Sequence, residues 1–190
     1  MSKPAAVFIA GPAGAGKTTL AVDVVKLGQS AGLPLALIDK DTICGRISSE
    51  LCTRLGIPGD RDSLLFKQVV RPLEYACVLD TAREQLNLGL SVCLPAPWSS
   101  EIKDGSLWHL FPTATSSAVY LIADIEELRC RIEQRGNPLD EYKLRNWDEF
   151  SGNLATMERR AREQGLFVTH QSQLALEWIG NAIGVYCHEL

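Results

Sequence analysis

Short apolar runs alternate along the chain with segments of helical periodicity. The apolar runs lie at residues 5–10, 33–38, 90–94, 117–123 and 166–169. Each has the length of a buried strand, and the segments between them carry apolar residues at the three- and four-residue spacing of an amphipathic helix. Strands that alternate with helices predict a parallel sheet with helices on both faces. The expected fold class is therefore α/β, with a five-stranded parallel sheet flanked by helices.

The helical segments follow from the same pattern and from local start and stop signals. They are expected at residues 19–27, 42–55, 60–89, 124–134, 147–164 and 173–186. Pro72 lies inside the third segment, where it either starts a new helix or kinks the existing one. Asp124 is a predicted N-cap, and Gly136-Asn137-Pro138 is expected to end the helix that Asp124 begins. No repeat or linker divides the chain, so residues 1–190 are predicted to form a single domain.

A glycine-rich motif follows the first apolar run. The sequence Gly11-Pro12-Ala13-Gly14-Ala15-Gly16-Lys17-Thr18 fits the pattern G-x-x-x-x-G-K-[ST] at every fixed position. Glycines let backbone N–H groups close around phosphates, and the start of the next helix adds partial positive charge. Lys17 is expected to contact the β- and γ-phosphates and Thr18 to bind Mg²⁺ through its hydroxyl. The alternative is a plain glycine-rich turn.

The motif therefore predicts the fold of a P-loop NTPase, with ATP and Mg²⁺ as cofactors. The residues expected to bind the nucleotide are Gly11, Ala13, Gly14, Ala15, Gly16, Lys17, Thr18 and Thr19.

Two acidic residues end the second predicted strand, in the sequence Asp39-Lys40-Asp41. Their carboxylates face the same side if the chain stays extended, at the strand end where α/β proteins bind ligands. Phosphoryl transfer uses one acid near Mg²⁺ and one that accepts the proton of the attacking hydroxyl. We assign Asp39, with Thr18, to the metal and Asp41 to the acceptor hydroxyl, and the two roles could be exchanged. The alternative is that Asp41 only caps the next helix.

The third predicted strand carries no acid at its end. Many P-loop proteins have a metal-binding aspartate there, whereas this chain has Leu94-Pro95. Asp39 is therefore the best candidate for the metal.

Arginines gather on the helix that ends at Gly136. Arg131 and Arg135 are four residues apart and so project from one face of that helix. Arginine side chains suit the neutralisation of a transferring phosphoryl group. Residues 131–147 are therefore expected to form a helical, mobile lid. The alternative is a solvated helix face, with nearby glutamates as ion-pair partners.

Two further side chains are candidates for contact with the acceptor. Trp98 follows two prolines after the third strand, and it either walls the substrate or anchors the loop. Arg46 lies one turn into the helix after Asp41, where it could hold an anionic group of the acceptor or be an ordinary surface arginine. The expected substrate-binding residues are thus Asp41, Arg46 and Trp98.

Composition and charge narrow the class of protein. The chain has 190 residues, of which 46% are hydrophobic and 22% charged, which is ordinary for a soluble domain. The formal net charge of −4 argues against a dominant electrostatic grip on nucleic acid. No apolar run approaches the roughly 20 residues of a membrane span, and no signal peptide is expected before the first strand. Six cysteines without a C-x-x-C pair predict a reducing, cytoplasmic compartment.

Several of these motifs together resemble the small P-loop kinases. They are Gly11–Thr19, the Asp39-Lys40-Asp41 step, and Arg131-Ile132-Glu133-Gln134-Arg135 followed by Asp140, Lys143-Leu144 and Trp147. The resemblance is to bacterial zeta-toxin-like and polynucleotide-kinase-like AAA-type ATP-binding proteins, with gluconate, shikimate and chloramphenicol kinases as more distant relatives. It implies phosphoryl transfer from ATP to a hydroxyl, carried by Lys17, Asp41, Arg131 and Arg135. Relatives often have an acid where Leu94 stands, which leaves open which carboxylate holds the metal.

These features predict an ATP-dependent kinase of a small hydroxylated molecule, such as an antibiotic, a sugar, a nucleoside or a metabolite. Two alternatives stay open: a kinase of nucleic-acid 5′ ends, and a nucleotide-dependent regulatory or toxin-type module without transfer. The paired aspartates and the arginine lid favour transfer, because a sensor needs no general base. Neither a nucleic acid nor a membrane is expected as a partner, and the oligomeric state is not predicted.

Overall fold

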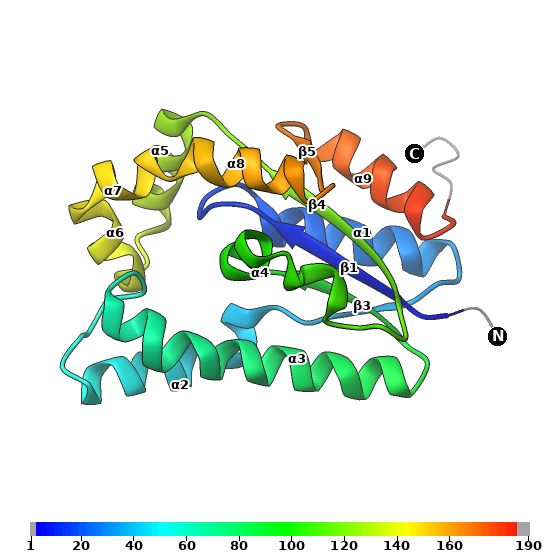
Figure 1. Cartoon of the computed structure of the whole chain (residues 1–190), viewed down its shortest axis with the longest axis horizontal. Helices are drawn as coiled ribbons and strands as arrows, with labels where there is room; N and C mark the ends of the chain where they lie inside the picture. The colour runs from blue at the N-terminus through cyan, green and yellow to red at the C-terminus, as the bar shows by residue number, and fades with distance from the viewer. Residues whose placement is uncertain (1–2, 186–190) are drawn as a thin grey trace.

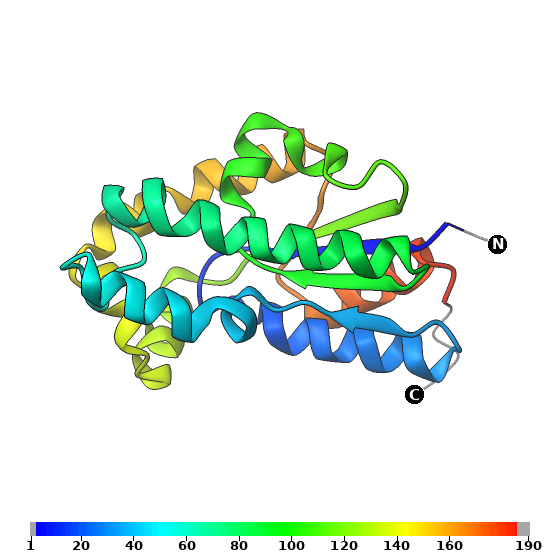
Figure 2. The ribbon, with the colours of Figure 1, turned by 90° about the horizontal axis from the view of Figure 1, so that it is seen from below.

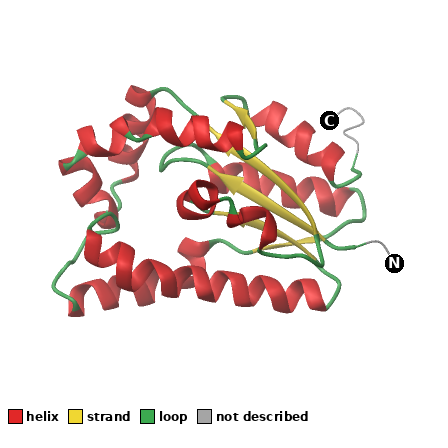
Figure 3. Ribbon diagram, in the orientation of Figure 1, coloured by secondary structure: helices red, strands yellow, loops and turns green. Residues whose placement is uncertain are grey.

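The computed structural model describes residues 3–185, and its centre is one sheet of parallel strands (Figures 1 and 3). The strands are β1 (Ala5–Ala10), β2 (Leu35–Leu37), β3 (Ser91–Pro95), β4 (Thr115–Leu121) and β5 (Phe167–Thr169). They lie in the order β2-β3-β1-β4-β5, and every neighbouring pair is parallel. The expected five-stranded parallel sheet is confirmed, and β1 is its central strand.

Helices cover both faces of this sheet. They are α1 (Lys17–Ser30), α2 (Lys40–Arg54), α3 (Arg71–Asn87), α4 (Ser99–Asp104), α5 (Ile125–Arg135), α6 (Glu141–Arg145), α7 (Trp147–Gly152), α8 (Leu154–Glu163) and α9 (Ser172–Ala182). A π-helical turn, η1 (Phe66–Val70), leads directly into α3. Figure 2 shows α2 and α3 running side by side past the carboxyl ends of the strands, which is where parallel sheets bind ligands.

Successive residues of β1 point alternately into two apolar cores, as the period of a strand requires. Phe8 packs in the core that α3, α4 and α8 cover, and Ile9 packs in the core that α1 and α9 cover. All six residues of β1 are buried. This double burial explains why the strand is continuously apolar, and it fixes the loop that follows β1 at the centre of the molecule.

The structure corrects some expected helix boundaries. The segment 60–89 is not one regular helix: a loop comes first, and the helical path that begins at Leu64 contains the π-helical turn η1 before it continues as α3. Pro72 therefore lies inside a continuous helical path, directly after η1, and does not start a separate helix. The segment 147–164 is divided into α7 and α8 at Asn153. The short helix α4 was not expected from the sequence. The last helix ends at Ala182, and the expected part beyond residue 185 lies outside the described residues.

The signals expected at the two ends of α5 are confirmed. The carboxylate of Asp124 accepts a hydrogen bond from the backbone N–H of Glu126 at 2.9 Å, so Asp124 is the N-cap of α5. Gly136 ends that helix with a φ of 57°.

The five cysteines within residues 3–185 are free thiols, whereas Cys187 lies outside that range. Within the described part of the chain, no helix combines the length and the apolar character that crossing a bilayer requires.

The close crossing of α1 over the start of β2 yields a test of the fold. A β-carbon at Gly28 would lie 2.5 Å from the carbonyl oxygen of Leu33 and 2.1 Å from Cδ1 of Leu35. Alanine is the better helix former by about 1 kcal/mol, but overpacking costs about 1–3 kcal/mol. We expect Gly28→Ala to lower the free energy of unfolding by about 1–2 kcal/mol in urea denaturation.

Gly152 in α7 is the matched control, because a β-carbon there meets nothing within 4 Å. Gly152→Ala should leave stability unchanged or raise it slightly. If Gly28→Ala were as harmless as Gly152→Ala, the tight packing of α1 against β2 would be wrong.

Candidate active site

The loop between β1 and α1 has the backbone that a phosphate cradle needs. Gly11, Gly14 and Gly16 have φ angles of 139°, 80° and 87°, in the region that favours glycine. A β-carbon at Gly11 would lie only 2.5 Å from the carbonyl oxygen of Leu121 in β4, so this position accepts glycine alone. Gly16 begins α1 without a side-chain cap among the described residues. The first amides of α1 are therefore available to an anion.

The other expected cradle residues take different places. Ala13 lines the cavity described below, with Gly11, Lys17 and Thr18. Ala15 is buried, and its N–H donates to the carbonyl oxygen of Pro12 at 3.3 Å. Thr19 is exposed in the first turn of α1.

Lys17 is a cation held in a desolvated position. Its Nζ donates a hydrogen bond to the carbonyl oxygen of Pro12 at 2.6 Å. Burial lowers the pKa of Lys17 to about 7; Asp41 opposes this shift, and three neighbouring cations add to it. A phosphate group would supply the countercharge that this position lacks. The geometry of Lys17 therefore suits a phosphate ligand.

Thr18 and Asp39 bring two oxygens together beside the cradle. The hydroxyl of Thr18 donates to Oδ2 of Asp39 at 3.3 Å, although the two residues come from different helix starts. Hydroxyl and carboxylate oxygens are ligands that Mg²⁺ prefers, and Mg²⁺ keeps water and phosphate oxygens as its other ligands. Within residues 3–185 no cluster of three or more His, Cys, Asp or Glu offers an alternative metal site. The donor set at Thr18 and Asp39 thus fits Mg²⁺.

The sequence suggested that Asp39 and Asp41 lie on one extended strand. In the structure they instead lie at the start of α2. Oδ1 of Asp39 accepts from the backbone N–H of Asp41 at 2.8 Å, which makes Asp39 the N-cap of α2. The alternative in which Asp41 is the cap is therefore wrong. Asp41 lies in the first turn of α2 and lines the cavity.

A charged cluster that the sequence did not predict surrounds Asp41. Lys40 Nζ donates to Oδ1 of Asp41 and to Oε2 of Glu74, each at 2.9 Å. Arg61 Nη1 donates to the same Oδ1 at 2.8 Å, and its Nη2 lies 3.8 Å from Oε1 of Glu74. Lys40 and Glu74 are only 7% and 3% exposed. The only signal in the sequence was the position of Lys40 between two aspartates.

The cluster fixes both the charge and the orientation of Asp41. Burial by itself would raise the pKa of this carboxyl, but Lys40 and Arg61 outweigh burial and lower the pKa to about 2. Both cations bind Oδ1, so Oδ2 is the oxygen left to a ligand in the cavity. Asp41 is therefore an ionised hydrogen-bond acceptor that its neighbours hold in place.

The predicted lid residues lie next to the cradle. Arg131 Nη1 donates to the carbonyl oxygen of Gly14 at 3.1 Å, and its Nη2 donates to Glu127 at 2.5 Å. Arg135 lines the cavity and pairs with Asp140. The structure thus contains both the expected approach to the cradle and the alternative ion pair with a glutamate on α5.

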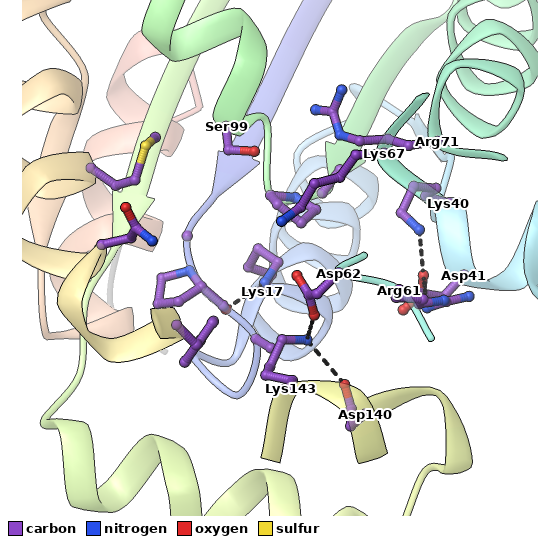
Figure 4. Close-up of a pocket in the computed structure, with 18 of the residues that line it drawn as sticks. Lys17, Lys40, Asp41, Arg61, Asp62, Lys67, Arg71, Ser99, Asp140 and Lys143 are labelled. Atoms are coloured by element: carbon purple, nitrogen blue, oxygen red, sulfur yellow. Dashed lines mark hydrogen bonds and ion pairs between the residues drawn. The ribbon is translucent and has the colours of Figure 1, made fainter. Parts of the chain in front are cut away.

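Further ion pairs join the lid segment to the loop before η1. Lys143 Nζ lies 3.2 Å from Asp140 Oδ1 and 3.2 Å from Asp62 Oδ2, as Figure 4 shows. A β-carbon at Gly59 would lie 2.8 Å from the carbonyl oxygen of Pro138, so the two segments are in close contact there. This side of the cavity is therefore closed by residues far apart in the sequence.

The cradle, the metal donors and Asp41 open into one cavity of about 450 Å³ (Figure 4). On one side it is lined by residues of η1, α3 and α4, namely Lys67, Arg71, Ser99, Ser100 and Lys103. On another side it is lined by residues of α7 and α8, including Phe150, Leu154 and Met157. Sequence reasoning did not predict these residues, because no motif marks them.

Two expected substrate-binding residues are not on this wall. Trp98 is 0% exposed; its indole N–H donates to the carbonyl oxygen of Leu94 at 3.0 Å, and its ring packs edge-on against Phe8 and Tyr75. The hypothesis that Trp98 walls the substrate is wrong, and the alternative of a loop anchor describes it. Arg46 is exposed on α2 and does not line the cavity, so it is a surface arginine.

The parallel sheet and the loop after its central strand define an α/β P-loop NTPase fold. The family AAA_33, described as an AAA domain, matches residues 7–159, and the chain belongs to this family. No curated protein sequence matches the chain significantly.

Solved structures share the fold at low sequence identity. A suspected kinase from Chloroflexus aurantiacus is 18% identical with a TM-score of 0.62, over 95% of this chain and 99% of that chain. Shikimate kinase from Acinetobacter baumannii, in complex with shikimate, is 18% identical with a TM-score of 0.55, over 95% of this chain and 94% of that chain. A chain of the Pnkp1/Rnl/Hen1 RNA repair complex is 15% identical with a TM-score of 0.59, over 88% of this chain and 48% of that chain. The likeness to P-loop kinases expected from the sequence is confirmed at the level of fold.

The lowered pKa of Lys17 makes stability depend on pH. Below about pH 7 the ammonium is charged in the folded and the unfolded chain, so folding bears the full cost of burying it. Between about pH 7 and 10.5 the unfolded chain keeps a proton that the folded chain has lost, so stability rises with pH. We expect Lys17→Met to unfold at higher urea than the wild type at pH 6.5, with a gap that narrows toward pH 9.5.

Lys26 provides the control, because it is an exposed lysine on the same helix. Lys26→Met should show no pH-dependent difference from the wild type. A constant gap for Lys17→Met across this pH range would contradict the lowered pKa.

Proposed function

We propose that the protein is an ATP-dependent phosphotransferase that moves the γ-phosphoryl group of ATP to a hydroxyl of a small molecule. The observation that carries this proposal is that one cavity joins the cradle at Lys17, the oxygens of Thr18 and Asp39, and the ionised carboxylate of Asp41. A nucleotide switch needs a cradle and a metal. It does not need a fixed, ionised carboxylate on an adjoining cavity.

Mg²⁺ and ATP, when bound, supply the phosphoryl group and neutralise part of its charge. On the side of the protein, the amides after Gly16 and the ammonium of Lys17 would hold the phosphates, and Thr18 and Asp39 would hold the metal. Binding of phosphate would restore full protonation of Lys17, whose pKa is lowered to about 7 in its absence.

Asp41 would orient the acceptor hydroxyl. Phosphoryl transfer has a loose transition state in which the nucleophile needs little deprotonation. A carboxylate with a pKa of about 2 is a weak base but a good hydrogen-bond acceptor. Oδ2 would accept a hydrogen bond from the hydroxyl and take its proton late in the reaction, while Lys40 and Arg61 keep Oδ1 in place.

Residues 131–147 would act as the lid of this site. Arg131 already contacts the cradle, and Arg135 lies on the cavity wall. A movement of α5 toward the cradle would bring both guanidinium groups to a transferring phosphoryl group, where they would stabilise its charge. Closure of this segment would also exclude water, which would otherwise compete with the acceptor.

A small acceptor fits better than the end of a nucleic acid. The likeness to the RNA repair complex concerns the fold, and the chain itself carries a net charge of −4. Strong binding to a phosphate backbone usually rests on several unbalanced cations. An antibiotic, a sugar, a nucleoside or another metabolite is the proposed acceptor class. The proposed compartment is the cytoplasm, where ATP is abundant and free cysteines stay reduced.

The contrast between Asp39 and Asp41 tests this mechanism. A library of hydroxylated compounds is incubated with Mg·ATP and the protein, and mass spectrometry detects the gain of one phosphoryl group. With the acceptor found, we expect Asp41→Asn to lower kcat by about 10²- to 10⁴-fold with Mg·ATP affinity nearly unchanged. Asp39→Asn should instead raise the Mg²⁺ concentration needed for half-maximal rate. In the wild type, kcat should show no decrease from protonation of Asp41 between about pH 5 and 8.

Asp80→Asn is the control, because Asp80 is an exposed carboxylate of α3 outside the cavity. It should leave kcat and the Mg²⁺ requirement unchanged. If Asp39→Asn lowered kcat and Asp41→Asn raised the Mg²⁺ requirement, Asp39 would be the residue that orients the hydroxyl and Asp41 the metal ligand. Full activity of both variants would contradict the roles given to the two aspartates. Binding of Mg·ATP without transfer to any acceptor would instead support a nucleotide-dependent regulatory module.

A further inference from the structure

Two lysines on the cavity wall have no partner of opposite charge. Lys67 in η1 and Lys103 in α4 line the cavity, and neither ammonium has a hydrogen-bond or ion-pair partner among residues 3–185. The other lining cations outside the cradle all pair with carboxylates: Lys40, Arg61, Arg71, Arg135 and Lys143. The charge of Lys67 and Lys103 is therefore available to an anion in the cavity.

Arg71 adds fixed donors beside Lys67. It lies four residues further along the same helical path, and its Nη2 donates to Glu101 at 3.1 Å. Its guanidinium lies 4.0 Å from the centroid of the Tyr75 ring, and the side chain is 18% exposed. A guanidinium has five N–H donors, so the bond to Glu101 leaves others for a ligand. Figure 4 shows the side chain of Lys67 extending into the cavity, with Arg71 and Ser99 near it.

The wall formed by α7 and α8 has a different character. There the cavity is lined by the apolar side chains of Phe150, Leu154 and Met157, together with the polar side chains of Glu149 and Asn153. A ligand that fills the space between the two walls would meet cations and hydroxyls on one side and hydrocarbon with two polar groups on the other. Such a site discriminates by charge, because a neutral ligand would displace water from the ammonium of Lys67 without supplying a countercharge. Arg71 keeps its ion pair with Glu101 and offers its remaining N–H donors.

We propose that the acceptor carries an anionic group, a carboxylate or a phosphate, in addition to the hydroxyl that is phosphorylated. Lys67 and Arg71 bind this group, Lys103 lies at its edge, and the hydrocarbon part of the acceptor packs on α7 and α8. The anion site is separate from the cradle for ATP, because its cations come from η1, α3 and α4 rather than from the loop after β1. This inference rests on the proposed function and names its substrate class.

The test compares acceptors that differ only in charge. Aliphatic and aromatic hydroxy acids are each paired with their primary amides, and sugar phosphates are paired with the parent sugars. Phosphoryl transfer from ATP is followed by mass spectrometry and by release of ADP. We expect kcat/KM to favour the anionic member of the best pair by about 10- to 100-fold, the range for one charge-assisted hydrogen bond. A larger ratio of kcat/KM for the acids over their amides indicates a carboxylate, and a larger ratio for the sugar phosphates over their parent sugars indicates a phosphate.

Lys67→Gln should raise KM for the anionic acceptor by about 10-fold or more and remove most of the preference over the neutral partner. KM for ATP should stay unchanged, and Lys67→Arg should keep the preference. Lys26→Gln, an exposed lysine on α1, is the control and should behave as the wild type. A purely structural role of Lys67 would weaken anionic and neutral acceptors alike.

Three results would overturn the proposal: equal rates with acids and amides, a rise in KM for ATP in Lys67→Gln, or preference for an oligonucleotide with a free 5′-hydroxyl. If the wild type phosphorylates no compound at all, the proposed function fails. The anion site is then decided by calorimetric titration of the acids and amides into protein loaded with Mg²⁺ and a non-hydrolysable ATP analogue. Preferential binding of an acid that Lys67→Gln abolishes would support the site, and equal weak binding of acids and amides would overturn it.

Discussion

The buried carboxylate of Glu74 is the constraint on which the acceptor side of the site depends. A charge that is only 3% exposed must be paired, because removing one partner of a buried ion pair costs several kcal/mol, about 3–5. Glu74 lies on α3, and its partners Lys40 and Arg61 come from the start of α2 and from the loop after it. Pairing therefore fixes these three segments relative to one another. Since Lys40 and Arg61 also bind Oδ1 of Asp41, the position and the charge of that carboxylate follow from the same contacts.

The phosphate side of the site depends on a steric constraint instead. Because β1 is the central strand, its loop emerges between β3 and β4, and Gly11 passes so close to Leu121 that no other residue fits. This contact sets the direction in which the loop turns into α1, and hence the positions of Lys17 and Thr18. The hydrogen bond from Thr18 to Asp39 joins the two sides. The ion pairs of Glu74 thus fix one side of the cavity, and the close contact of Gly11 with Leu121 fixes the other. The proposed metal site lies between the two sides.

Local sequence patterns were enough to predict the individual strands, the cradle and the cap at Asp124, since each depends on neighbours within a few residues. The alternation of strands with helices was enough to predict that the sheet is parallel. They did not predict contacts between distant segments. Lys40 and Glu74 are 34 residues apart, so their pairing leaves no local pattern. Trp98 follows two prolines, which suggested a loop residue. In the structure it is the N-cap of α4, has a φ of 51°, and packs its ring in the core. Lys67 and Arg71 belong to a predicted helix, and only the packing of η1 and α3 brings them to the cavity.

A crystal structure with Mg²⁺ and a non-hydrolysable ATP analogue tests the central claim most directly, namely that the cradle and Asp41 serve one reaction in one cavity. The account predicts that the triphosphate lies on the loop after β1, that the metal binds the hydroxyl of Thr18 at about 2.1 Å, and that the terminal phosphate faces Oδ2 of Asp41 across free space for a hydroxyl. A terminal phosphate that is shielded from the cavity, or one that points away from Asp41, would contradict it.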